Sequence, residues 1–252
     1  MLTMAKAIRV KLFQQMSNYR KPSSFTVRES FPLPPYSSVI GMIHTACGFE
    51  SYHPMQISIQ GSSAGEVSDC MTMYSFGIKY DPSRHQYKVK NENGEYDGIT
   101  RGMKYAHLLT DVYLVIHILP DRDEDYEQIV HGLQYPQNFI SLGRHEDVVR
   151  IDEVAEVELC RMDPEDDYVV YNTKFSSYLP TAYYDEDDNT REGIEGTIYT
   201  IPKIFEITKK GRQWKEVVSA RLLPEGMEII NRVMEHENVF YDVACKLPVF
   251  FA

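Results

Sequence analysis

Long apolar runs are missing from this sequence, and so is a recognisable export signal. The longest unbroken apolar stretches, such as Val112–Leu119, carry a histidine and fall far short of the ~20 residues that a membrane span requires. The N-terminal stretch MLTMAKAIRVKLFQQ has no apolar core followed by small residues at a cleavage site. We therefore expect a cytoplasmic protein that makes no contact with a membrane.

Cysteine is scarce as well. The four cysteines are widely separated and form neither a CxxC pair nor the closely spaced ligands of a zinc knuckle; they are Cys47, Cys70, Cys160 and Cys245. We expect buried, reduced thiols, and neither a metal nor another cofactor. A chain of 252 residues, 43% of them hydrophobic, can bury a sizeable core without disulfides.

Acidic residues are missing from the first 28 positions, although the chain as a whole has a formal net charge of −11. The basic residues of that stretch are Lys6, Arg9, Lys11, Arg20, Lys21 and Arg28. The overall negative charge argues against non-specific coating of DNA, because a polyanion is repelled at long range. A solvated basic edge and a phosphate-facing surface would both have this sequence, and the patterns that follow favour the second.

The segment AIRVKLF alternates between apolar and basic residues. Ile8, Val10 and Leu12 fall on one face of a strand with a period of two, and Arg9 and Lys11 fall on the other. We therefore expect a β-strand that presents both cations outward on one face of a sheet.

The run FPLPPYSSVIGMIHTACG predicts an extended, proline-rich segment that turns into a helix. We expect Ser37 or Ser38 as the N-cap and Gly48 as the terminator. Gly41 within the helix costs about 1 kcal/mol relative to alanine, so we expect another group to approach the backbone there. Unpaired N–H groups, two hydroxyls and the helix dipole would converge on a phosphate at the start of this helix, although an ordinary N-cap would have the same sequence.

Further along the chain, strand and helix patterns alternate. The segments MQISIQ and DVYLVIHIL are typical of strands, and the Asn93-Gly94 pair between them predicts a hairpin turn. DRDEDYEQIVHGL has helical spacing behind an acidic first turn, and a final strand is expected near Val154–Leu159.

This order of elements, βαββαβ, predicts an α+β fold. We expect a ferredoxin-like domain of the RNA-recognition (RRM) type over residues 1–162, with an inserted β-hairpin thumb at about residues 77–107. Short β-like runs after it predict a smaller, β-rich C-terminal lobe over residues 163–252.

The loop SLGRHED is a second candidate site for a phosphate. Gly143 permits a backbone turn that can direct successive N–H groups at an anion, and Arg144 and His145 add donors. The alternative is an ordinary helix-to-strand turn whose arginine pairs with Glu146 or Asp147.

Taken together and in this order, the two motifs are more specific than either alone. FPLPPYSSVIGMIHTACG resembles the proline-rich, serine-led helix of the RAMP-type CRISPR-associated proteins, and SLGRHEDV resembles the later glycine loop of their Cas family five. The resemblance covers residues 5–160, and the C-terminal part is most similar to subtype I-B members. It implies a Cascade subunit that binds and caps the 5′ handle of crRNA. It also implies partners in the backbone and large subunits, and target DNA reached indirectly through the complex.

Carried over to this chain, the resemblance implies a set of RNA-binding residues. The handle would lie near the basic strand and stretch, the helix start and the glycine loop, and the thumb would reach over it. The residues so implied are Arg9, Lys11, Arg20, Lys21, Arg28, Ser37, Ser38, Arg101, Lys104, Tyr105, Gly143, Arg144 and His145.

The competing interpretation is an enzyme, because a related branch of the same family cuts precursor RNA without a metal. Tyr19, Lys21, His44 and His145 are candidate groups, but no spacing forces any two together. A histidine in an apolar strand, such as His117, is more often structural. The acid clusters at 163–167 and 185–188 are typical of solvated loops rather than of metal ligands. We expect binding and not catalysis, with a generic interaction module as the third alternative.

Overall fold

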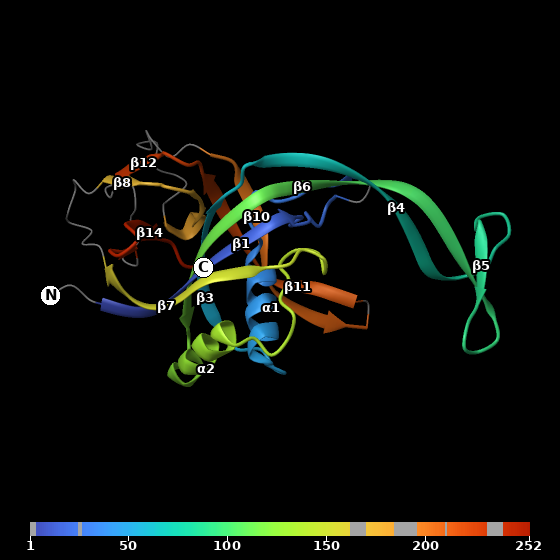
Figure 1. Cartoon of the computed structure of the whole chain (residues 1–252), viewed down its shortest axis with the longest axis horizontal. Coiled ribbons are helices and arrows are strands. Elements are labelled where there is room, and N and C mark those ends of the chain that lie inside the picture. The colour runs from blue at the N-terminus through green and yellow to red at the C-terminus, as the bar shows by residue number, and fades with distance from the viewer. Residues whose placement is uncertain (1–3, 25–26, 162–169, 184–195, 210, 231–238) are drawn as a thin grey trace.

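The computed structural model describes residues 4–24, 27–161, 170–183, 196–209, 211–230 and 239–252. Most of these residues form antiparallel sheet, and two α-helices accompany it, so the expected α+β class is confirmed. Figure 1 shows a body that holds both helices and a long curved arm that leaves it on one side.

The helices are α1 (Tyr36–Cys47) and α2 (Asp123–Gln134), with a short 3-10 helix at Thr181–Tyr183. The strands are β1 (Met4–Ser17), β2 (Val27–Arg28), β3 (Met55–Ser62), β4 (Gly65–Lys79), β5 (Tyr87–Lys90), β6 (Tyr96–Pro120), β7 (Arg150–Arg161), β8 (Val170–Asn172), β9 (Ser176–Pro180), β10 (Ile198–Thr208), β11 (Gly211–Leu223), β12 (Glu228–Ile230), β13 (Phe240–Asp242) and β14 (Leu247–Val249).

Four strands form the centre of the main sheet in the order β3-β6-β1-β7, and each pair of neighbours is antiparallel. The chain passes through α1 between β1 and β3, and through α2 between β6 and β7. Alternation along β1 places Ile8, Val10 and Leu12 in one core with side chains of both helices. Both helices therefore cover the same face of this sheet.

The ends of α1 differ in how well the sequence predicts them. Gly48 ends the helix in the left-handed region at φ 70°, as expected. The N-cap is Pro35, in an extended conformation, so the expectation that Ser37 or Ser38 caps the helix is wrong and both serines lie in its first turn. No described atom lies within 4 Å of the position of a Cβ at Gly41, so the expected close approach is also not found within the described chain.

The arm consists of β4, β5 and the first part of β6 (Figure 1). The predicted Asn93-Gly94 turn joins β5 to β6, with Gly94 at φ 79° and a hydrogen bond from Asn91 N to Glu95 O of 2.8 Å. The register of β4 with β6 runs from Gly65 opposite Thr110 to Lys79 opposite Asp97. The hairpin therefore starts at Gly65, ahead of residue 77.

The C-terminal segments add strands at both sides of the central four. The hairpin of β10 and β11 joins through β9 to β3, and β13 and β14 join β7. The β-rich character expected after residue 163 is thus present in the described part, as strands of the same main sheet and a separate β8–β12 pair. The division into two lobes at residue 162 stays a prediction.

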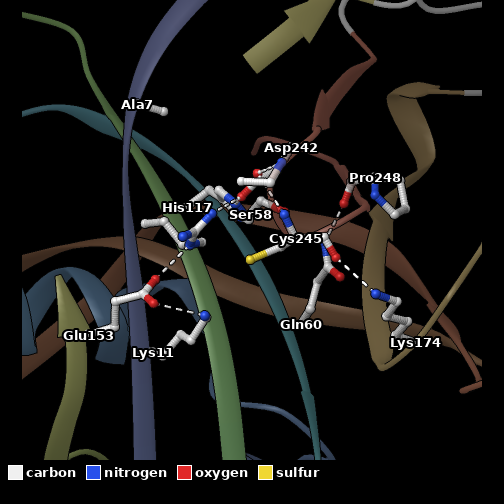
Figure 2. A network of polar contacts seen from close by, with 12 residues as sticks. Ala7, Lys11, Ser58, Gln60, His117, Glu153, Lys174, Asp242, Cys245 and Pro248 are labelled. Atoms are coloured by element: carbon white, nitrogen blue, oxygen red, sulfur yellow. Dashed lines mark hydrogen bonds and ion pairs between the residues drawn. The ribbon is translucent and has the colours of Figure 1, made fainter. Parts of the chain in front are cut away.

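A buried ionic network links the first strand to the C-terminal segment. The guanidinium of Arg9 donates to Asp242 at 2.7 Å and to Glu153 at 2.8 Å, and His117 Nε2 lies 3.0 Å from the Asp242 carboxylate. Figure 2 shows Lys11 on the other oxygen of Glu153, at 2.9 Å. Arg9 is only 7% exposed, so the expectation that both strand cations point outward is wrong for Arg9.

The reason is that the C-terminal segment covers this face of the sheet. Leu247 and Val249 are buried, and Val249 packs with Ala7 of β1 and Leu159 of β7. The carboxylate of Asp242 also accepts the backbone N–H groups of Ala244 and Cys245, so it is fully paired despite burial.

The network changes the acid–base properties of its members. Burial would raise the pKa of Asp242, but hydrogen bonds from His117 and Arg9 hold it well below its usual range. Burial lowers the pKa of His117 and outweighs its contact with Asp242. His117 is thus held neutral within the core, as expected for a structural histidine.

We predict that His117 makes folding stability pH-dependent below its unfolded pKa of about 6.5. The folded pKa lies below the unfolded value of about 6.5, so the unfolded chain takes up the proton first as the pH falls. The free energy of unfolding is therefore highest above the unfolded pKa and decreases as the pH falls below it. Urea midpoints of the wild type and of His117→Gln measure the effect, and equal pH slopes in the two proteins would contradict it.

The thiols are less buried than the sequence predicts. All four cysteines are free, but only Cys47 is buried, whereas Cys70 on β4 is exposed and the other two are half-buried. The expectation is wrong for Cys70 because β4 leaves the core and joins the arm. None of the described helices is long and apolar enough to cross a membrane.

Candidate nucleic-acid interface

A hollow of about 700 Å³ lies between the start of α1, the loops that contain Arg20 and Gly143, and the β10–β11 hairpin. We call it the arginine pocket. Its lining residues are Asn18, Tyr19, Arg20, Pro22, Arg28, Pro35, Ser37, Ser38, Gly41, Met42, Thr45, Phe139, Ser141, Gly143, Arg144, Pro202, Phe205, Arg212 and Trp214. The two phosphate sites predicted separately from the sequence, at the helix start and at the glycine loop, therefore line one cavity.

The first turn of α1 offers hydrogen-bond donors to this pocket. Pro35 O accepts from Ser38 N at 3.0 Å, and Pro35 provides no side-chain cap. Within the described chain, the hydroxyls of Ser37 and Ser38 make no hydrogen bond, and both residues are half-buried. These hydroxyls and the positive end of the helix dipole favour an anion in the pocket.

The glycine loop is held together by one buried carboxylate. Asp147, 2% exposed, accepts the backbone N–H groups of Asn18 at 2.9 Å and of Arg144 at 2.8 Å on the same oxygen. Its other oxygen accepts Arg144 Nη2 at 2.7 Å. Gly143, at φ 110°, lies against both Asp147 and Asn18, so a Cβ there would collide with them.

Arg144 thus forms the ion pair that the sequence left open as the alternative to a phosphate contact. It pairs with Asp147 and, at 3.2 Å, with Glu146. Burial opposes its charge, but the hydrogen bond with Asp147 outweighs burial and raises the pKa of Arg144. The arginine is therefore charged and fixed in position at the wall of the pocket.

Basic side chains predominate among the charged residues of the pocket lining. Four arginines line it and, among the described lining residues, none is acidic. Arg20 donates to Ser24 O and Arg28 contacts the Met73 sulfur, so neither is paired with a carboxylate within the described chain. Such a surface matches the charge and the donor geometry that phosphate groups require.

The sequence interpretation named only six of the residues that line this pocket as RNA-binding, and it missed every contribution of the β10–β11 hairpin. Phe205, Arg212 and Trp214 reach the pocket from the β10–β11 hairpin. Their segment reads as two ordinary strands, and no local motif marks it as a binding surface. The only available signal was the single tryptophan of the chain in a charged, polar neighbourhood.

Several predicted residues lie outside the pocket. Arg9 and Lys11 belong to the buried network, and Lys21 pairs with Glu29 at 3.3 Å. His145 is exposed, and its ring meets the ring of the pocket residue Phe139 edge to face. RNA contacts by these residues stay predictions. The side chains of Arg9 and Lys11 are already ion-paired with carboxylates of the protein.

The three predicted thumb residues lie on the β6 side of the arm. Because side chains alternate along a strand, Arg101 and Tyr105 share one face and Lys104 lies on the other. Arg101 and Tyr105 are exposed, and Lys104 is half-buried. These residues cannot all contact RNA through a single face of the arm.

The groups considered for catalysis do not meet in the structure. Tyr19 lines the pocket, but it is 1% exposed, its hydroxyl donates to Gln14, and burial raises its pKa far above the usual value. His44 lies among Phe49, Tyr52 and His53, outside the pocket. Both acid clusters, at 163–167 and 185–188, lie outside the described residues, and no group of metal-ligating side chains is found within the described part.

The chain is similar in fold to solved structures of CRISPR proteins. One component of a structure described as a CRISPR RNA-guided surveillance complex is 17% identical, with 95% of this chain and 97% of that chain covered and a TM-score of 0.51, which shows a shared fold. A CRISPR protein from Archaeoglobus fulgidus is 11% identical, with 97% and 98% covered and a TM-score of 0.44. No curated protein sequence matches the chain.

The sequence also matches a protein family, described as CRISPR-associated protein (Cas_Cas5), over residues 7–213. The matched region includes β1, the helix α1, the arm, the glycine loop and the start of the β10–β11 hairpin. Because the match extends over most of the chain, this protein belongs to the CRISPR-associated Cas5 family.

Proposed function

We propose that this protein is an RNA-binding subunit of a type I CRISPR–Cas surveillance complex and that it caps the 5′ handle of crRNA. The observation that carries the proposal is the arginine pocket. Two motifs more than 100 residues apart in sequence, at Ser37 and Gly143, line it together with Arg20 and Arg28, which have no carboxylate partner in the described chain. Phosphates of single-stranded RNA fit this combination of cations, hydroxyls and a helix start.

The arm supports a role in assembly with the backbone and large subunits. Nine large apolar side chains of the arm face solvent: Val67, Tyr74, Phe76, Ile78, Tyr87, Val89, Tyr96, Met103 and Tyr105 are each more than 40% exposed. Clustered apolar exposure of this kind marks interaction surfaces. Target DNA would be reached only through the assembled complex.

The finer assignments form part of the same proposal. The strand order β3-β6-β1-β7 with helices on one face supports a ferredoxin-like, RRM-type domain over residues 1–162, followed by a second lobe over residues 163–252. We assign the chain to subtype I-B from the resemblance of its C-terminal part, and to the cytoplasm, where crRNA is assembled.

A salt titration tests which cations hold the RNA. We expect affinity for a 5′-handle oligonucleotide to fall steeply with salt, and Arg20→Ala with Arg28→Ala to reduce the slope of log K against log salt by about 2 units, since each phosphate contact contributes about 1. Fluorescence anisotropy of labelled RNA measures this. Lys11→Ala distinguishes the arginine pocket from the surface of β1 as the RNA site. An unchanged salt slope would leave the pocket as the site, whereas a slope reduced by about 1 unit would show that the surface of β1 also contacts RNA.

A metal-independent endoribonuclease that processes precursor crRNA is the alternative function. Incubation of the full chain with repeat RNA in chelator distinguishes the two. Cleavage that is lost in His44→Ala or His145→Ala would overturn the binding-only proposal, and intact RNA supports it.

A further inference from the structure

Three side chains of the β10–β11 hairpin contribute to the lining of the arginine pocket. Phe205 pairs directly with Trp214 across the hairpin, after a register shift next to Ile204. Arg212 precedes Trp214 by two positions, so both point to the same face of β11. All three line the pocket.

Their geometry is that of a preformed aromatic platform. The rings of Phe205 and Trp214 meet edge to face, with centroids 6.2 Å apart and an interplanar angle of 89°. The guanidinium carbon of Arg212 lies 4.0 Å from the centre of the Phe205 ring. Each side chain thus fixes its neighbour, while Trp214 remains 41% exposed toward the pocket.

Elements other than the hairpin supply a further aromatic ring and three of the four arginines. Phe139 is 60% exposed and lines the pocket beside Arg144. The cavity, at about 700 Å³, lies within the range of about 300–1,000 Å³ usual for ligand sites. A molecule that fits this lining presents flat apolar faces to the aromatic rings and regularly spaced negative charges to the arginines.

We propose that Phe205, Arg212 and Trp214 form a nucleobase subsite, in which an unpaired base of the bound RNA stacks on this platform while its phosphates face Arg20, Arg28 and Arg144. This inference rests on the proposed RNA-binding function and adds a base contact to it. Stacking uses the π-face that every base has, so the subsite selects an unpaired base and not a particular sequence.

The single tryptophan of the chain makes the subsite directly observable. Trp214 fluorescence is followed while the full-length protein is titrated with a 5′-handle RNA and with a series of the same RNA that carries one abasic position each. We expect the intact RNA to quench the indole. One abasic position should abolish the quenching and weaken binding about five- to 150-fold, the equivalent of 1–3 kcal/mol for one stacked base.

Variants test the same contact without fluorescence. Trp214→Phe keeps a ring and should bind nearly as the wild type, whereas Trp214→Ala should lose affinity for intact RNA and none for the critical abasic RNA. Tyr52→Ala is the matched control, because Tyr52 is 43% exposed and lies outside the pocket. Circular dichroism melts establish that each variant is folded.

The outcomes separate this inference from the proposed function. RNA that binds by anisotropy without quenching Trp214, and equally well with every abasic position, would overturn the subsite and leave the handle-binding proposal intact. RNA that does not bind the chain at all would overturn both.

Discussion

Asp242→Ala is expected to lower the free energy of unfolding by about 3–5 kcal/mol, because buried Arg9 keeps only its ion pair with Glu153 and buried His117 loses its partner. Arg9 loses its shortest ion pair, at 2.7 Å, and His117 loses its contact inside a core where it is 0% exposed. For a chain of this length the melting temperature should fall by roughly 10 °C or more. Chemical denaturation and calorimetry of the two proteins measure the change.

A second substitution tests the mechanism. If the cost arises from an uncompensated buried charge, Asp242→Ala combined with Arg9→Met should be more stable than Asp242→Ala alone. Glu92→Ala, an exposed acid at the tip of the arm, is the control and should leave the melting temperature unchanged. If Asp242→Ala melted at the same temperature as the wild type, the network would not stabilise the fold.

Arg144→Ala is expected to reduce affinity for the 5′-handle RNA about ten- to 150-fold, the equivalent of about 1.5–3 kcal/mol for a charge-assisted hydrogen bond. It should also destabilise the fold by about 1–3 kcal/mol, because Asp147 stays buried without a cation. Arg144→Lys should restore only part of the affinity, since lysine cannot bind in a bidentate manner. Anisotropy and thermal melting are measured on the same preparations.

The double variant Arg144→Ala with Asp147→Asn separates the two effects. In the structure one oxygen of Asp147 accepts both backbone N–H groups, so an amide oxygen in its place keeps the loop closed without a buried charge. We expect melting to recover and RNA affinity to stay low. Recovery of both would reduce Arg144 to a structural ion-pair partner and remove it from the RNA site.

The parts of this fold that the sequence predicted are those determined by neighbouring residues. The acidic first turn of α2, the left-handed Gly48 and the Asn93-Gly94 turn all follow from local chemistry and appear as expected. The N-cap of α1 was wrong by only a few residues, because the prolines before it hold the chain extended up to Pro35. Local signals thus located elements better than their ends.

The site required contacts that no local pattern contains. Arg9 has the same alternating neighbourhood as a solvated cation, and its partner Asp242 is 233 positions away. Ser37, Gly143 and Trp214 meet only because α1 packs against β10 and the glycine loop is closed by Asp147. The sequence therefore identified the separate motifs of the candidate site, but not their union or the aromatic wall.

The distance between Arg9 and Asp242 also has a consequence for biosynthesis. At about 5–20 residues/s, the ribosome adds Asp242 roughly 10–50 s after Arg9, so the first strand can pair with β6 and β7, and Arg9 with Glu153, well before the second carboxylate is available. A nascent chain that stops before Asp242 lacks this second carboxylate and the strands β13 and β14, which pack against Ala7 and Leu159. We expect such shortened chains to expose this apolar surface, which is the kind of surface that chaperones and proteases select.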